Sequence, residues 1–267
     1  MNPYEDYSDN ISDLEPRDYL LRLNLDFDVD SQLIAIRWLL NRNQKADKEQ
    51  TEEIRQIEEH TRHVTGLAAE HAVDQWVDQL HYSTYQSAAH SMSSVGMLAP
   101  LLETIFYQCF RGIGREFYPA THPVQSHVRW ESAHAVQWDC HFVITGKHPT
   151  KNVVQGILQL ADAIGLLSRL PADLARTLSA LFSYRNNMFH HGFEWPMEER
   201  QRFAKRITEE RWPADWFSKA EVGNEPLIFY MTDKFIDHCM NTINQILDAT
   251  GLFVKDVLVP LHDARGD

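Results

Sequence analysis

The sequence predicts an all-α protein, with a helical bundle in its C-terminal part and a region of long helices before it. Apolar side chains recur every three to four residues over most of the chain. The stretch 45–86 contains no proline and one glycine. No series of strands with alternating apolar and polar residues is present. Together these observations favour helices packed on helices.

Composition restricts the class of protein. The chain has 267 residues, of which 43% are hydrophobic and 24% charged, so it is long enough to bury a core. No apolar run approaches the ~20 residues that span a bilayer, and the N-terminus does not resemble a secretory signal. Three cysteines lie far apart and form no CxxC pair. We therefore expect a cytoplasmic protein with no membrane segment, disulfide framework or zinc knuckle.

The net charge of −13 is unevenly distributed. Residues 1–30 hold nine acidic residues and two arginines, and we expect this segment to be partly flexible. The total charge argues against a protein coated with nucleic acid, because such proteins usually have a basic surface. A local basic site elsewhere in the chain is compatible with this net charge, because the charge is unevenly distributed.

Residues 31–118 are expected to form a helical region of unknown role. Residues 33–40 should form a short helix that ends at the polar residues 41–43. Residues 45–86 should form one long helix or two helices in line, and residues 98–110 a further helix. Two prolines in residues 117–124 predict a break. A third region, residues 119–267, is expected to follow it.

This third region should form the bundle. Helical spacing predicts helices at residues 126–143 and 152–170, and another from Pro171 to about His191. Gly192 suits the left-handed conformation that often follows a helix end. The remaining elements expected are a charged helix at 197–210, a short extended segment at 227–231, and a helix at 233–249 with Thr232 as its N-cap.

The groups suited to chemistry lie just before Gly192, in Tyr184-Arg185-Asn186-Asn187-Met188-Phe189-His190-His191. Arg185 continues an apolar stripe of the helix, whereas Asn186 and His190 share a second row. Arg185 and His190 are separated by about 140° around an ideal helix. One straight helix would not aim both side chains at one point. A helix end, or a second copy of the helix, would bring them together.

These residue types suit cleavage of an RNA phosphodiester. A histidine with a pKa near neutrality can remove the proton of the attacking 2′-hydroxyl or protonate the leaving oxygen. An arginine can stabilise the charge that develops on the phosphoryl oxygens. RNA supplies its own nucleophile, so this chemistry requires neither metal nor cofactor. Asn186 would orient the imidazole or the phosphate.

A purely structural role is the alternative. Arg185 would then extend from the edge of the apolar stripe into solvent. His190 and His191 would cap the helix C-terminus, where positive charge is favoured.

The segment resembles the signature of HEPN domains (higher eukaryotes and prokaryotes nucleotide-binding). That signature is Arg, a polar residue and then His, with four to six residues between Arg and His, and here four separate Arg185 from His190. An apolar helix, a short connector and a second helix that ends with the motif provide similar context. The resemblance covers residues 153–192 and does not extend to residues 1–118.

The resemblance implies a metal-independent endoribonuclease that acts as a homodimer, with two copies of the motif in one cleft. Arg185 would bind the phosphate, His190 would be the acid/base group, and Asn186 their polar partner; His191 also satisfies the spacing. It further implies a toxin or antiviral defence setting, with an antitoxin or defence-system partner. The competing hypothesis is a non-catalytic helical module that binds a protein, a nucleotide or RNA.

Other clusters are weaker. His60 and His63 have the spacing of metal ligands on a helix, but a solvated charged face explains them better. His127, His134 and His141 recur every seven residues, which coincidence explains better among 14 histidines. Trp195 follows the motif and is expected to pack in a turn. The sequence contains neither a P-loop nor a nucleophile elbow.

Overall fold

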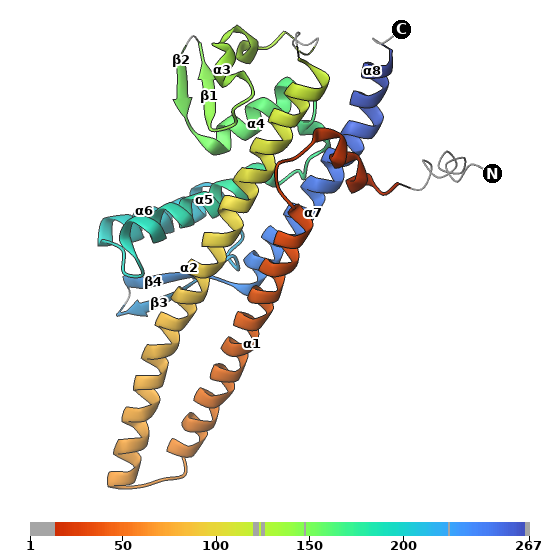
Figure 1. Cartoon of the computed structure of the whole chain (residues 1–267). Helices are drawn as coiled ribbons and strands as arrows, with labels where there is room; N and C mark the ends of the chain where they lie inside the picture. Colours follow the sequence, from red (N-terminus) through yellow and green to blue (C-terminus); the bar gives the residue numbers. More distant parts are fainter. Residues whose placement is uncertain (1–13, 120–122, 124–125, 147, 224, 265–267) are drawn as a thin grey trace, which may run out of the picture. The chain divides into compact units, whose positions relative to one another are not determined.

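The computed structural model describes residues 14–119, 123, 126–146, 148–223 and 225–264. Helices predominate in these residues, so the predicted fold class is confirmed at that level (Figure 1). Two short β-hairpins interrupt the helices. Most of the acidic N-terminal segment, residues 1–13, lies outside the described residues, as do residues 120–122 and 124–125 of the expected break.

The chain divides into two compact units, each assembled from separated stretches. Unit 1 contains residues 1–28, 100–178 and 240–267. Unit 2 contains residues 29–99 and 179–239. Both units take residues from either side of residue 118, where the sequence suggested a boundary, so the division differs from the expected one.

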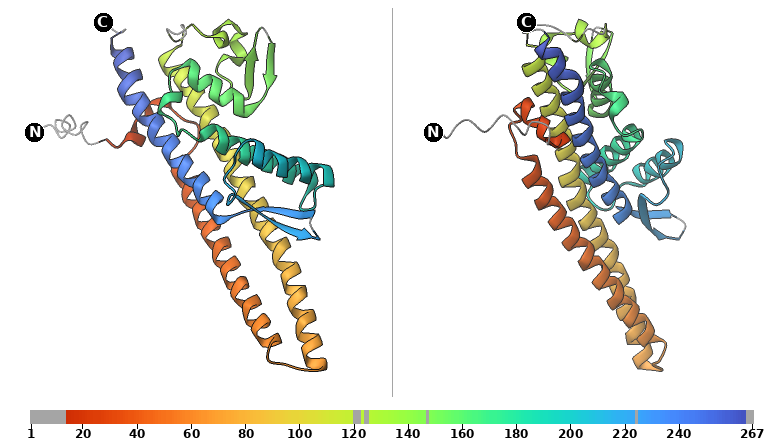
Figure 2. Two further views of the ribbon diagram at one scale, coloured as in Figure 1. Left: turned by 180° about the vertical axis from the view of Figure 1, so that it is seen from behind. Right: turned by 90° about the vertical axis from the view of Figure 1, so that its right-hand side faces the viewer.

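Unit 2 begins with two long helices. Helix α1 (Val29–Thr61) runs through residues 41–43, so the predicted helix end there is wrong. Polar residues lower helix propensity only slightly, and a long helix tolerates them. The chain then turns at residues 62–66, where Gly66 has a φ of +67°. The two helices are therefore not in line: the unit 2 part of α2 (Leu67–Phe117) returns alongside α1 (Figures 1 and 2).

Helix α2 also includes residues 98–110, which were expected to form a separate helix. It continues through Pro100, although proline lacks the N–H that would bond to the carbonyl of Gly96. Gly112 and Gly114, which follow the expected end of that helix, lie inside α2. The helix ends at Phe117, where the sequence predicts a break.

The rest of unit 2 surrounds an aromatic core. Helix α6 (Met197–Glu209) is followed by the antiparallel strands β3 (Phe217–Val222) and β4 (Glu225–Met231), which confirms the extended segment at 227–231. Thr232 caps helix α7 (Asp233–Phe253), since its Oγ1 accepts a hydrogen bond from the Phe235 N–H at 3.3 Å. The buried rings of this core belong to Tyr184, Trp195, Phe203, Phe217 and Phe229.

Unit 1 contains the other hairpin and several short helices. Between α2 and α5 (Leu174–His191) lie η3 (Val128–Glu131), α3 (His134–Gln137), β1 (Phe142–Thr145), β2 (His148–Lys151), α4 (Val153–Ala163) and η4 (Leu167–Arg169). The chain termini contribute η2 (Pro16–Leu23), the π-helical η5 (Val254–Leu258) and α8 (Val259–Asp263). Among the described residues, no helix has both the length and the apolar character to cross a bilayer.

The helix predicted at residues 126–143 is wrong, and Arg129 shows why. Its side chain is fully buried, and its guanidinium donates to the backbone carbonyls of Gln137 at 2.6 Å and Phe142 at 3.0 Å. It also donates to the carbonyls of Val136 and Asp139. Burial lowers the pKa of Arg129 to about 10. A helical pattern of apolar residues does not reveal that backbone carbonyls of the segment will accept hydrogen bonds from a buried side chain and not from the N–H groups of a helix.

The helix predicted at 152–170 forms only in its first part. Asn152 caps α4, since its Oδ1 accepts from the Gln155 N–H at 3.1 Å. The helix ends at Ala163, and Gly165 has a φ of +80°. Gly156 lies against β1: a Cβ there would be 2.1 Å from the carbonyl oxygen of Cys140.

Candidate functional site

The motif occupies the last two turns of α5. This helix begins at Leu174, three residues later than predicted, and ends at His191 as predicted. Gly192 has a φ of +73°, and its N–H donates to the Met188 carbonyl at 3.0 Å, which closes the helix end. The predicted C-terminal glycine is therefore confirmed. The motif residues belong to unit 2.

Buried contacts fix the orientation of this helix end. Leu181 and Met188 are fully buried. The hydroxyl of the buried Tyr184 donates to the Phe229 carbonyl at 3.0 Å, and burial raises the pKa of Tyr184. Trp195 is 2% exposed and donates from Nε1 to the Gly192 carbonyl at 2.9 Å. Trp195 therefore packs in the turn, as expected, and does not offer a stacking surface.

Arg185 is half-buried at the edge of the apolar stripe. Its Nη1 donates to the Oδ1 of Asn186 at 3.2 Å, and its guanidinium lies 5.9 Å from the ring centre of Phe189. Among the described residues, no carboxylate forms an ion pair with Arg185. The nearby arginines of α6 differ, because Arg202 pairs with Glu199 at 2.7 Å and Arg206 with Glu210 at 2.5 Å. Arg185 thus presents a positive charge that an anion can neutralise.

Phe189 adds a contact surface that the sequence reasoning missed. Its side chain is 55% exposed although it is large and apolar. The end of its ring lies over Gly96 of α2, where an added Cβ would be 3.3 Å from Cζ. An exposed ring beside a guanidinium is a surface on which a nucleobase can stack. Its position four residues after Arg185 indicates that the two side chains are neighbours on the helix surface. The sequence does not show that the ring of Phe189 is exposed.

Asn186, His190 and His191 are exposed. The two imidazole rings lie 6.3 Å apart between centres. Among the described residues, no hydrogen bond joins Arg185 to His190, in keeping with their separation around a regular helix. The structure therefore brings Arg185 and Asn186 together, and it leaves both histidines exposed without a hydrogen bond to the guanidinium in the described residues.

A small pocket extends the polar surface beyond Asn186. Its volume is about 210 Å³. Arg206 donates to the hydroxyls of Ser183 at 2.9 Å and Ser179 at 3.0 Å. Burial acts to raise the pKa of Glu210, but hydrogen bonds from Ser179 and Arg206 lower it overall. The residues that line the pocket are Ser183, Asn186, Asn187, Glu199, Arg202, Phe203 and Arg206.

The weaker clusters do not form metal sites in the described residues. His60 and His63 are exposed near the end of α1, and no group of three or more His, Cys, Asp or Glu residues in the described chain is arranged to hold a metal ion. His127, His134 and His141 do not share a helix. His141 instead lies between two carboxylates, with Nδ1 2.6 Å from Asp139 and Nε2 2.9 Å from Glu103.

Comparison of the chain with protein families, curated proteins and solved structures found no match.

Proposed function

We propose that this protein is a metal-independent endoribonuclease in which Arg185, Asn186 and His190 act on the RNA phosphodiester. The observation that carries the proposal is the accessible guanidinium of Arg185, which no carboxylate of the described residues neutralises although the chain has a net charge of −13. A phosphate is the anion that a guanidinium binds with two parallel hydrogen bonds.

The mechanism uses the three side chains in different roles. Arg185 holds the scissile phosphate and stabilises the charge of the transition state. His190 removes the proton of the 2′-hydroxyl or protonates the leaving 5′-oxygen, and His191 is the alternative for this role. Asn186, bonded to Arg185 at 3.2 Å, keeps the guanidinium in place. Phe189 stacks on a neighbouring base.

The active species is a homodimer. Because Arg185 and His190 diverge around one helix, a single copy does not present both groups to one phosphate. A second copy of α5 across a two-fold axis supplies the missing histidine to each arginine. The exposed ring of Phe189 supplies apolar surface for such an interface.

The test is RNA cleavage by the purified full-length protein in the presence of a chelator. Attack by the 2′-hydroxyl leaves a 2′,3′-cyclic phosphate and a 5′-hydroxyl, which mass spectrometry of a short substrate identifies. We expect wild type to produce these ends, and Arg185→Ala and His190→Ala to lose activity by at least about a hundredfold. Arg37→Ala and His63→Ala, which remove exposed residues of the same types in unit 2, serve as matched controls.

Three results would contradict the proposal: products with 3′-hydroxyl ends, equal activity in all variants, or an inert wild type. If inert wild type bound RNA and Arg185→Ala did not, the non-catalytic binding module would be the correct hypothesis.

A further inference from the structure

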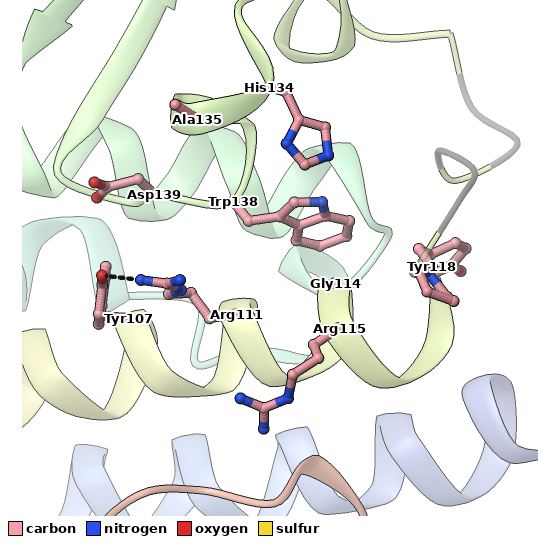
Figure 3. A pocket seen from close by; sticks show the side chains of 10 residues that line it. Tyr107, Arg111, Gly114, Arg115, Tyr118, His134, Ala135, Trp138 and Asp139 are labelled. Carbon is pink, nitrogen blue, oxygen red and sulfur yellow. Dashed lines mark hydrogen bonds between the residues drawn. The ribbon is translucent and has the colours of Figure 1, made fainter.

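Unit 1 contains a larger pocket that the ribonuclease proposal does not use. Its volume is about 400 Å³, within the roughly 300–1,000 Å³ of ordinary small-molecule sites. It lies between the last turns of α2 and the segment that carries His134 and Trp138 (Figure 3). In that segment short helices and turns, held by the buried Arg129, replace one continuous helix.

One side of the pocket is aromatic. Trp138 stacks on Tyr118 with the ring centres 5.9 Å apart and 21° between the planes, and its ring also lies 5.1 Å from that of Trp130. The indole sits directly on α2 at Gly114, where an added Cβ would be 2.6 Å from it. Figure 3 shows the exposed imidazole of His134 above this indole. Trp138, Tyr118 and His134 all line the pocket, and aromatic side chains of this kind are the ones on which planar rings stack.

The opposite side carries a guanidinium available to an anion. Arg111 is exposed, donates to the Tyr107 hydroxyl at 2.5 Å and lies 5.3 Å from its ring centre (Figure 3). Among the described residues it forms no ion pair. The guanidinium of Arg115, in contrast, already forms an ion pair with Glu116 at 2.6 Å and donates to the Leu23 and Asn24 carbonyls. A guanidinium has five N–H donors, so Arg111 keeps donors for an anion.

Asp139 contributes an acceptor to the same pocket. Its Oδ1 accepts from the backbone N–H of His141 at 2.9 Å and lies 2.6 Å from the Nδ1 of that residue. These contacts hold the carboxylate in one orientation. No described residue donates to its Oδ2. An oriented carboxylate oxygen can accept from the N–H groups of a nucleobase.

We propose that this pocket binds a nucleoside phosphate, with its base against Trp138 and its phosphate on Arg111. The aromatic side chains match the face of the base, the guanidinium of Arg111 matches the phosphate, and the oriented carboxylate of Asp139 matches the N–H groups of the base. The proposal is independent of the ribonuclease proposal, because it concerns other residues, in unit 1, and binding alone.

The experiment is isothermal titration of the full-length protein with AMP, GMP, CMP and UMP. Guanosine, ribose 5-phosphate and inorganic phosphate are the partial ligands that separate the contribution of the base from that of the phosphate. We expect at least one nucleotide to bind at least about tenfold more tightly than any partial ligand, because base stacking and charged hydrogen bonds both contribute.

Two variants test the assignment without removing core residues. Arg111→Gln removes the exposed guanidinium and should weaken nucleotide binding by at least about tenfold. Ala135→Trp places a large side chain at an exposed position that lines the pocket and should abolish binding. Arg37→Gln is the control for a lost surface charge, and thermal unfolding checks that each variant is folded.

The proposal is overturned if no nucleotide binds at millimolar concentration, if phosphate alone binds as tightly as the nucleotides, or if both pocket variants bind like wild type.

Discussion

The buried Arg129 allows a quantitative test of how residues 126–143 of unit 1, which do not form the single helix expected, are held in place. Replacing it by methionine keeps much of the side-chain volume and removes the charge and all hydrogen-bond donors. The guanidinium donates to the backbone carbonyls of Gln137, Phe142, Val136 and Asp139 and to Gln159 Oε1. Each hydrogen bond to a charged group contributes about 1.5–3 kcal/mol, so five would sum to more than about 7 kcal/mol.

The desolvation of the buried guanidinium offsets part of the stabilisation that these hydrogen bonds provide. Burial lowers the pKa of Arg129 from its usual value to about 10, which corresponds to a cost of about 3 kcal/mol for the charged form. Some of the released carbonyls would also regain water. Breaking one side of a buried charged network usually costs about 3–5 kcal/mol, and we expect that loss in the free energy of unfolding for Arg129→Met. Arg129→Lys should be intermediate, since lysine lacks the planar fork.

Urea unfolding followed by tryptophan fluorescence measures the change, because Trp130 and Trp138 lie in the affected segment. Arg37→Met is the surface control. A loss below about 1 kcal/mol for Arg129→Met, which is the size of an ordinary point mutation, would refute the reasoning.

Three further predictions concern other parts of the chain. Gly156→Ala should destabilise by about 1–3 kcal/mol in the same urea assay, because its Cβ would collide with the Cys140 carbonyl and push α4 away from β1. Burial raises the pKa of Cys109 from 9.0 to about 12, so the folded protein keeps a proton that the unfolded chain loses. This thiol should therefore contribute a loss of stability of about 1.4 kcal/mol per pH unit as pH rises from 9 to 12, and serine at this position should reduce the total slope by that amount. Finally, if the active site is shared between two copies, mixing inactive Arg185→Ala with inactive His190→Ala should restore part of the RNA cleavage; no recovery after subunit exchange would contradict a shared site.

Much of the helical structure was predictable because apolar spacing and end signals act locally. Gly192 ended α5, Asn152 and Thr232 capped the helices that follow them, and each behaved as its residue type predicts. The errors arose where contacts other than those between neighbouring helical turns decide the outcome. Arg129 donates to carbonyls 7 to 13 residues later in the chain, and two short helices and a strand form there in place of one expected helix.

The candidate site was predictable to a similar extent. The stripe that contains Leu181 and Met188 predicted that Arg185 would continue a buried face; Leu181 and Met188 are fully buried, whereas Arg185 is half-buried. The position of the Phe189 ring depends on its contact with Gly96, which is 93 positions earlier in the chain. The pairing of Arg202 and Arg206 with carboxylates, which distinguishes them from Arg185, depends equally on side-chain conformation. The spacing of residues along the chain shows neither the contact of Phe189 with Gly96 nor the ion pairs of Arg202 and Arg206.

The interleaving of the two units has a consequence for how the protein can be divided. The chain passes between units four times, and three of these passages lie within α2, α5 and α7. A single proteolytic cut therefore cannot release either unit whole, and no contiguous gene fragment encodes one. Removing one unit would cut α2, α5 and α7 at the boundary. Each cut helix would then lose some of its backbone hydrogen bonds in the unit that remains. Foreign sequence should instead be tolerated in the turn at residues 62–66, which interrupts none of these helices.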